Sequence, residues 1–564
     1  MYDLILKGGR IYDGSGLPSF GADVAIAGGR IEAIGRIDEP AHRILNVDGL
    51  AVSPGFIDFH THLDAQFFWD PLGSSLNEHG ITTVVTGNCG LTLAPVKPQD
   101  HEALVGTFIR VEGMPAKVLR SEVPWGWTAH GEYMDALRSR PLGLNIATLV
   151  GHCAVRQYVM GDSSVERAAT EDEIQAMEQL VRDGMDAGAF GFSTNMNDRH
   201  FREDGKPIPS RLAEREEVDR LCGVVGDFQR GVIQFSHGGF RSAQHMDWYN
   251  DVAKATGRPL IWQSILHRWA DPEMWRWQLD QTADSFRQGA PAYPITNARP
   301  FSNRWTLKDA QVFDELPTWK NVLFLPIEAR KEAFRDSETR RKMTFEAVED
   351  TRPISFSRRW DIIKIRKTRP EHQQWQNKSV AEYASAAGKP VIDAFLDLSL
   401  SEDLETLFES SDNQGDPDAV GEILRSPYVL VGQSDAGAHL AFDAGFGYAT
   451  LLLGYWSRDR HVMPLEEAVR KLTFMVASIF DIRDRGLLRP GYVADVAVFD
   501  PDTVMAEDRE MVNDLPGGEP RYVQHARGMH CTIVNGEVLM EDGQHAGAYP
   551  GRVLSSSPSA GQAR

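Results

Sequence analysis

The sequence predicts an α/β protein, a (β/α)8 TIM-like barrel with insertions, together with small β structure at both ends of the chain. Short apolar runs alternate with helical stretches through the middle of the 564-residue chain, as in strands joined by βα connections in a parallel sheet. This middle part spans about 400 residues, which suits an eightfold barrel with an insertion. Alternating apolar residues around glycine turns predict the β structure at the two ends.

The N-terminal β structure is predicted from DVAIAGGRIEAIG, residues 23–35. Apolar residues alternate on both sides of Gly28-Gly29, and that pattern indicates a hairpin. A similar pattern returns near the other end, in GYVADVAVFDP and around a turn at Asn535-Gly536. The residues themselves allow two arrangements, either two small β units or one β domain assembled from both termini.

Six apolar runs are the predicted strands of the barrel. They span residues 82–88, 144–152, 188–194, 231–237, 259–267 and 428–437. A helix is predicted before the third run, because Thr170 and Glu173 have the spacing of a capping box. A helical stripe follows them, formed by Ile174, Met177, Val181 and Met185. Residues 464–480 show a similar helical pattern.

Residues 268–380 are too long for simple βα units, so they predict an insertion. Six of the 13 tryptophans fall between Trp262 and Trp319, and they suggest an aromatic-rich lid whose rings either contact an apolar substrate group or pack the insertion itself. The last residues, 551–564, are predicted to be a disordered tail because they are rich in Ser, Gly and Pro.

Composition limits the classes of partner. The formal charge of −21 argues against broad binding of nucleic acid or anionic membranes. We find no run of 18 apolar residues and no signal-peptide pattern, so we expect no membrane span and a cytoplasmic protein. The four cysteines are scattered along the chain, which suits a reducing compartment. The sequence leaves open whether the protein forms a homo-oligomer.

Metal-binding or acid–base side chains follow several of the predicted strands. The first is VSPGFIDFHTHLD, in which His60 and His62 occupy positions i and i+2 and so share one face of an extended chain. The other strand ends carry Cys89, His237, His267 and Asp435. In a TIM barrel the carboxyl ends of the strands meet at one mouth. A single histidine after a strand is usually an ordinary polar residue, but this coincidence favours a metal site.

These motifs resemble the amidohydrolase superfamily and, within it, the N-acyl-D-amino-acid deacylase (D-aminoacylase) group. The resemblance covers nearly the whole chain and rests on PGFIDFHTHLD, GNCG, GFST, SDAGAHL and RGLLRPGYVADVAVFDPDTV. It implies one composite β domain, built from residues 1–52 and 486–550, and a barrel formed by the residues between them, 53–485. Other superfamily members bridge two metals with a carboxylated lysine on the fourth strand. GAFGFSTN has no lysine, and in the D-aminoacylase group a cysteine takes that role.

The resemblance also implies the roles of the site residues. Cys89, His237 and His267 would hold one tight zinc, although the run before His267 leaves about two residues of slack in the alignment. His60 and His62 would line a second, weaker site. Asp435 would be the general acid/base. His439 would lie beside it at the substrate, in a stretch that departs from the His- and Pro-rich one expected of the group.

The implied reaction is zinc-dependent cleavage of an amide C–N bond in a small molecule, an N-acyl-D-amino acid giving a carboxylate and a D-amino acid. A substrate carboxylate needs a cation, preferably an arginine. The candidates are Arg268, Arg299 and Arg304. The alternatives are a related hydrolase of another amide, a carbamate or a cyclic amide, and a catalytically inactive scaffold. A scaffold would have lost its metal ligands and aspartate, whereas this sequence retains them.

Overall fold

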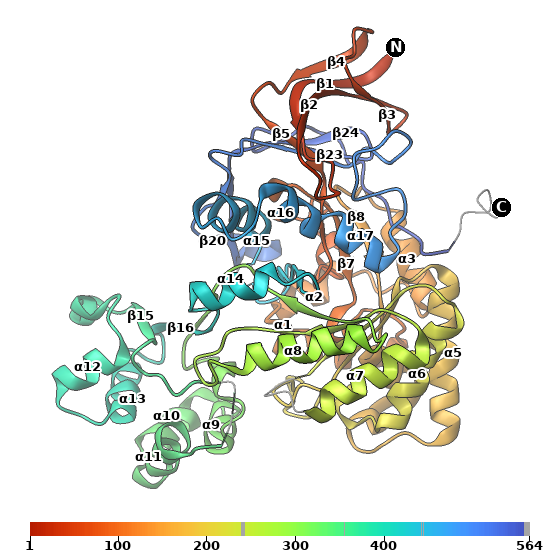
Figure 1. The fold of residues 1–564 in the computed structure, drawn as a ribbon. Helices are drawn as coiled ribbons and strands as arrows, with labels where there is room; N and C mark the ends of the chain where they lie inside the picture. The colour runs from red at the N-terminus through yellow and green to blue at the C-terminus, as the bar shows by residue number, and fades with distance from the viewer. Residues whose placement is uncertain (238–242, 353, 355, 441–442, 444, 558–564) are drawn as a thin grey trace.

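The computed structural model describes residues 1–557 apart from 238–242, 353, 355, 441–442 and 444. Three parts are visible in Figure 1: a β sheet that contains the N-terminus at the top, a barrel with its helices below it, and an insertion at the lower left. This is the predicted fold class. In the described part of the chain no helix combines the length and the apolar character needed to cross a bilayer.

One mixed sheet joins the two ends of the chain, with strand order β25-β24-β23-β18-β5-β1-β2-β3 and β4 beside β1. Its strands are β1 (Tyr2–Ile11), β2 (Phe20–Ala27), β3 (Arg30–Gly35), β4 (Ala41–Asn46), β5 (Ala51–Pro54), β18 (Val496–Phe499), β23 (Met529–Val534), β24 (Glu537–Glu541) and β25 (Gln544–His545). The link between the halves is the antiparallel pair β5–β18. Of the two arrangements, the structure therefore has the composite one.

Both predicted hairpin turns are present in this sheet. Gly28 and Gly29, between β2 and β3, have φ of +57° and +77°. Asn535 and Gly536, between β23 and β24, have φ of +49° and +86°. Two successive left-handed residues make the turn whose twist matches that of paired strands. Glycine and asparagine adopt this conformation at the lowest cost.

The barrel strands run parallel. They are β6 (Phe56–Asp58), β7 (Ile81–Thr86), β8 (Asn145–Thr148), β9 (Val150–Gly151), β10 (Gly191–Asn195), β11 (Val232–Ser236), β12 (Leu260–Gln263), β13 (Ala292–Thr296) and β17 (Leu430–Val431). β8 and β9 are consecutive pieces of one run, and they connect the order β6-β7-β8 to the order β9-β10-β11-β12-β13-β17. Beyond the last strand, the Asp435 N–H donates to the His60 carbonyl at 3.2 Å and brings the two ends of the barrel together.

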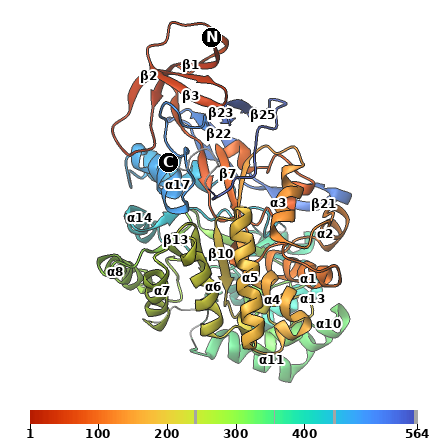
Figure 2. The ribbon, with the colours of Figure 1, turned by 90° about the vertical axis from the view of Figure 1, so that its right-hand side faces the viewer.

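Helices pack around the barrel, and Figure 2 shows several of them side by side along its outer surface. Those outside the insertion are α1 (His101–Glu112), α2 (Ala116–Glu122), α3 (His130–Arg138), α4 (His152–Met160), α5 (Glu171–Ala187), α6 (Arg215–Asp227), α7 (Ala243–Thr256), α8 (Met274–Arg287), α14 (Pro417–Arg425), α15 (Tyr448–Leu451), α16 (Leu465–Leu472) and α17 (Phe474–Phe480). The predicted capping box starts α5, where the Thr170 side chain accepts from the Glu173 N–H. The predicted apolar stripe of α5 is buried.

The insertion begins later than the predicted residue 268 and ends later than residue 380. The segment after Gln263 still belongs to the barrel, because α8 leads into β13. The insertion itself consists of β14 (Phe301–Trp305), α9 (Pro317–Leu323), α10 (Ile327–Arg335), α11 (Ser337–Thr344), β15 (Lys364–Lys367), α12 (Val380–Ala387), α13 (Val391–Ser401) and β16 (Leu407–Asn413). Its apolar side chains form a core of their own.

The clustered tryptophans divide between two cores. Trp262 and Trp275 are buried in the barrel, whereas Trp305 and Trp319 are buried in the insertion. Of these four, Trp305 also lines the cavity described below. These four tryptophans therefore mainly pack protein cores, which is the second of the two roles considered for the cluster.

The C-terminal segment differs from the predicted tail. The Gly551 N–H donates to the Leu142 carbonyl at 2.7 Å, and the Ser556 N–H donates to the Gly188 carbonyl at 3.0 Å. Residues 551–557 are thus hydrogen-bonded along the barrel, because backbone donors and acceptors can pair there whatever their side chains are. Residues 558–564 of the predicted tail lie outside the described residues.

A part of the predicted C-terminal β region also lies outside the composite sheet. Two hairpin-like pairs form there, β19 (Met505–Ala506) with β22 (Ala526–Arg527) and β20 (Glu510–Leu515) with β21 (Glu519–Val523). Between them, Arg509 reaches the insertion, where it donates to the Ser302 carbonyl at 3.0 Å. The segment that contains these two strand pairs therefore contacts the insertion and helps to hold it in place.

Candidate active site

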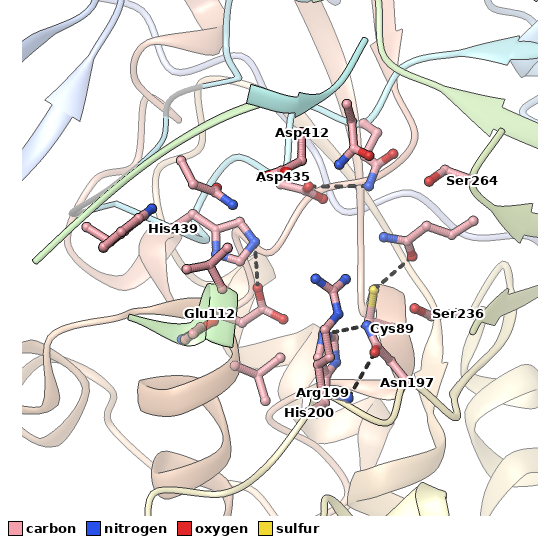
Figure 3. A pocket seen from close by; sticks show the side chains of 18 of the residues that line it. Cys89, Glu112, Asn197, Arg199, His200, Ser236, Ser264, Asp412, Asp435 and His439 are labelled. Atoms are coloured by element: carbon pink, nitrogen blue, oxygen red, sulfur yellow. Dashed lines mark hydrogen bonds and ion pairs between the residues drawn. The ribbon is translucent and has the colours of Figure 1, made fainter. Parts of the chain in front are cut away.

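A cavity of about 400 Å³ lies at the carboxyl ends of the barrel strands, between the barrel and the insertion. The barrel contributes His62, Cys89 and Asp435 to its lining, and the insertion contributes Trp305 and Phe356. Figure 3 shows side chains from several loops converging on this space. The fold therefore places the substrate-sized cavity where a barrel places its active site.

His60, His62 and Cys89 form a compact buried group. Their ligand atoms all lie within 4.8 Å of one another, and the distance from Cys89 Sγ to His60 Nε2 is 3.5 Å. The chain leaves β6 at Asp58, and the two histidines then project to the same side. The His62 N–H donates to the Ala436 carbonyl at 2.7 Å, which fixes this loop against the one that carries Asp435.

Asp435 lies beside this group. Its Oδ1 is 3.3 Å from His60 Nε2 and 4.0 Å from His62 Nε2. The side chain is only 6% exposed, and Oδ1 accepts no hydrogen bond from the described residues. Burial raises the pKa of Asp435 to about 8, because removal from water penalises the charged form.

This buried group suits a zinc ion. Two imidazole nitrogens and a sulfur are ligand types that zinc prefers, and the Asp435 carboxylate lies beside them. Burial, with Glu112 and Asp435 nearby, raises the pKa of the Cys89 thiol well above its usual value. A bound cation would reverse this shift, since a thiol gives up its proton when it ligates a metal. The unsatisfied buried Asp435 oxygen points to the same requirement for a positive charge.

His237 also faces the cavity, at the end of β11. Its Nδ1 is 2.8 Å from the hydroxyl of Tyr249 on α7, and this contact orients the ring. The compact group of ligand atoms within 4.8 Å does not include it. His237 is therefore a cavity residue outside this group, whereas the resemblance implied that it would ligate the tight zinc.

His267 differs from expectation. β12 ends four residues earlier, at Gln263, and the Cys89 thiol donates to Gln263 Oε1 at 3.2 Å. His267 is held away from Cys89: its N–H donates to Gln414 Oε1 at 3.0 Å, and its ring packs against Trp269. It neither lines the cavity nor belongs to the compact group. The extra residues after the strand carry this histidine past the mouth.

The three candidate arginines have different surroundings. Arg299 is 8% exposed and is held by both carboxylate oxygens of Asp443. Arg304 lines the cavity, but its Nε donates to Glu409 at 2.6 Å and its Nη1 to the Tyr522 hydroxyl at 3.1 Å. Arg268 lines the cavity as well. Existing ion pairs therefore compete with any substrate carboxylate at Arg299 and Arg304.

Arg199 is a further cavity residue, which the sequence patterns did not predict. It follows β10, and Figure 3 shows its guanidinium pointing into the space between Glu112 and Cys89. Its Nε is buried without a hydrogen-bond partner among the described residues. The only signal in the sequence is a polar stretch after a strand, NMNDRH, and many solvent-exposed loops have similar composition.

Four residues of the cavity lining have left-handed backbone. Cys89, Gln433, Asp435 and His439 have φ of +54°, +67°, +53° and +57°. Non-glycine residues rarely adopt this conformation, and the cost is accepted most often at functional sites. His439, predicted to lie beside Asp435, also lines the cavity. Loops that carry the candidate side chains therefore include residues in this conformation.

Comparison with known proteins identifies the family of the chain. A model of a family described as amidohydrolase matches residues 43–540. A D-aminoacylase from Alcaligenes xylosoxydans xylosoxydans is 29% identical over 561 residues, which cover 98% of each chain.

Two solved structures extend the comparison. One is a D-aminoacylase studied for its binuclear metal centre, with activation by one metal and attenuation by a second. It is 25% identical, has a TM-score of 0.68, and the match covers 98% of this chain and 100% of that one. The other is an N-acyl-D-glutamate deacylase from Bordetella bronchiseptica in complex with zinc and a phosphonate inhibitor. It is 26% identical, has a TM-score of 0.68, and the match covers 98% and 99%.

Proposed function

This chain belongs to the amidohydrolase family, and from this we propose that it is a zinc-dependent hydrolase that cleaves an N-acyl-D-amino acid into a carboxylate and a D-amino acid. The observation that carries the proposal is the buried group of His60, His62 and Cys89 beside Asp435 at the base of a substrate-sized cavity. The similarity to D-aminoacylase and N-acyl-D-glutamate deacylase over nearly the whole chain supports the substrate class.

We assign the tight zinc to His60, His62 and Cys89, with Asp435 at its edge. The resemblance had implied Cys89, His237 and His267 for the tight zinc, with His60 and His62 at the weaker site. Zinc held there would supply Lewis-acid chemistry toward the amide carbonyl and the attacking water. His237 faces the same cavity, and it is our candidate for holding a second, weaker ion.

Asp435 moves the proton in this proposal. Its carboxylate takes the proton from the attacking water and passes it to the amide nitrogen, because an unprotonated amine is a poor leaving group. Its position supports the role: it lines the cavity and lies within 4.0 Å of both metal-ligand histidines. Its neighbour Gln433 donates weakly, at 3.4 Å, to the other oxygen, Oδ2.

We propose that Arg199 binds the substrate α-carboxylate, with Arg268 as the second candidate. A guanidinium recognises a carboxylate through two parallel hydrogen bonds. Arg199 points into the cavity, whereas Arg304 is already bound to Glu409 and Tyr522. A substrate carboxylate would provide the partner that Arg199 Nε lacks.

Substitution of Arg199 by Gln should raise KM for an N-acyl-D-amino acid about 10- to 100-fold. This range follows because a hydrogen bond to a charged group contributes about 1.5–3 kcal/mol and each 1.4 kcal/mol is a factor of ten. The same substitution should change KM little for the primary amide of that substrate, which lacks the carboxylate. Steady-state kinetics on the acid–amide pair would measure this difference.

Arg202→Gln is the matched control, since Arg202 lies on the same loop and pairs with Asp204 outside the cavity lining. This variant should leave KM unchanged for both the acid and the amide. Arg268→Gln assayed in parallel tests the second candidate. Equal losses on acid and amide in Arg199→Gln would show that this guanidinium does not read the carboxylate.

His267→Ala should retain the wild-type zinc content. His267 lies outside the compact ligand group, so its loss removes buried packing against Trp269 and no metal contact. We expect the free energy of unfolding to fall by about 1–3 kcal/mol, as for other buried truncations. Zinc analysis and thermal unfolding separate the two effects. Loss of zinc from this variant would return His267 to the ligand set.

The proposed function as a whole is tested with a panel of substrates. N-acetyl, N-formyl and bulky N-acyl derivatives of D- and L-amino acids are assayed beside hydantoins and carbamates, with zinc content determined for the same protein. We expect the N-acyl-D-amino acids to be hydrolysed fastest. A preference for the hydantoins or carbamates would assign the chain to another reaction of the family.

A further inference from the structure

Glu112 is a buried carboxylate next to the proposed metal ligands, and the proposed reaction does not use it. It is the last residue of α1, and Gly113 with φ of +62° ends the helix there. Only 2% of Glu112 is exposed. Its carboxylate lines the cavity on the side away from Cys89, as Figure 3 shows.

Two histidines flank this carboxylate. Glu112 Oε1 is 3.7 Å from His62 Nδ1, and Oε2 is 3.9 Å from His439 Nε2. The Glu112 main chain is tied to the same loop, since its carbonyl accepts from the His439 N–H. Glu112 therefore stands between a metal-ligand histidine and a residue of the substrate cavity.

We propose that Glu112 is a positioning residue that orients His62 toward the metal by accepting a hydrogen bond from the protonated Nδ1 of His62. Through His439, Glu112 also links this ligand to the cavity loop. The inference rests on the proposed function, because it requires His62 to bind zinc.

The two nitrogens of His62 point to different partners. Nε2 faces Asp435 Oδ1 at 4.0 Å, on the side where the ligand atoms converge, whereas Nδ1 faces Glu112. A neutral imidazole carries its proton on one nitrogen and a lone pair on the other. A carboxylate that accepts from Nδ1 therefore leaves the Nε2 lone pair for the metal, an arrangement that metal-binding histidines use widely.

The present separation is longer than a hydrogen bond. His62 Nδ1 is buried and makes no hydrogen bond with the described residues. A shift of roughly 0.8 Å would bring the 3.7 Å pair to the usual length of about 2.9 Å. Within the described chain, both ion-pair contacts of Glu112 are with histidines. Since a buried carboxylate is costly without a partner, these histidines are the groups that account for its position.

The test is the zinc affinity of Glu112→Gln, measured by competition with a chelator on the full-length protein. Glutamine keeps the shape, but its amide can present either a donor or an acceptor to His62, so the tautomer is no longer enforced. We expect zinc to bind about 10- to 100-fold more weakly, the usual effect of removing such a partner. Glu102→Gln, an exposed position on the same helix that pairs with Arg120, should bind zinc within about twofold of wild type.

A second readout separates positioning from direct ligation. With cobalt(II) in place of zinc, Glu112→Gln should keep the visible d–d bands of the wild type, because the ligand set is unchanged. The metal-free variant should unfold within about 2 °C of the wild type, so that weaker metal binding cannot be attributed to a damaged fold. Glu112→Asp, which keeps a shortened carboxylate, should bind zinc with an affinity between those of Glu112→Gln and wild type, and it serves if the glutamine variant does not fold.

Zinc binding by Glu112→Gln equal to that of Glu102→Gln would overturn the inference. Weaker zinc binding together with altered d–d bands would also overturn it, since Glu112 would then be part of the ligand set itself. These measurements need no substrate. A protein that binds zinc but hydrolyses no N-acyl-D-amino acid would therefore refute the proposed function and leave the role of Glu112 decided separately.

Discussion

Asp435→Asn should lower kcat by about 10²- to 10⁴-fold, the range for loss of a general acid–base group, while zinc stays bound. Asparagine keeps the size of the side chain and removes its ability to take a proton. His60, His62 and Cys89 remain in place as ligands, so the metal content should stay near that of the wild type. Rate measurements and zinc analysis on the same preparation would show whether kcat falls while the zinc content is unchanged.

The control for this variant must match its backbone. Asp435 has φ of +53°, and Asp481 has φ of +55° but lies outside the cavity, where its exposed carboxylate pairs with Arg483. Asp481→Asn should therefore keep full activity. If Asp435→Asn retained activity within about threefold of the wild type, the proton transfer would belong to another group, and His439 would be the next residue to substitute.

Cys89→Ala should lose most of the bound zinc and, with it, the activity. The wild type should contain about one tightly bound zinc per chain, and the sulfur is the only anionic soft ligand in the group, since the other two members are imidazoles. Removal of one ligand leaves an incomplete set, and the proposed reaction depends on the metal. Elemental analysis after dialysis, together with the rate on the best substrate of the panel, measures the effect.

Cys222→Ala is the matched control, because Cys222 is also a buried free cysteine but lies on α6, on the side that packs into an apolar core. It should keep zinc and activity and lose only a little stability. Full zinc content and activity in Cys89→Ala would exclude the thiol as a ligand. The assignment of the whole metal site would then have to be revised.

The local features of this chain were predictable from sequence because short-range forces produce them. The Gly28-Gly29 turn and the capping box of Thr170 and Glu173 depend on residues a few positions apart, and both form as expected. The βα alternation reflects burial of one apolar segment after another, and it predicted the barrel. The spacing of His60 and His62 predicted that their side chains would share one side, and the structure brings them together with Cys89.

Only the tertiary structure decided which polar residues meet. His267 follows its strand as the other ligands do, yet the chain runs four residues beyond Gln263 before it reaches this histidine, and Gln414 holds it elsewhere. Arg299 is paired with Asp443, 144 residues away in sequence. Glu112 reaches the cavity from the end of helix α1 and Arg199 from the loop after β10, and no motif in the sequence marks either residue. Side-chain partners of this kind depend on contacts between distant segments, and local sequence patterns carry no information about them.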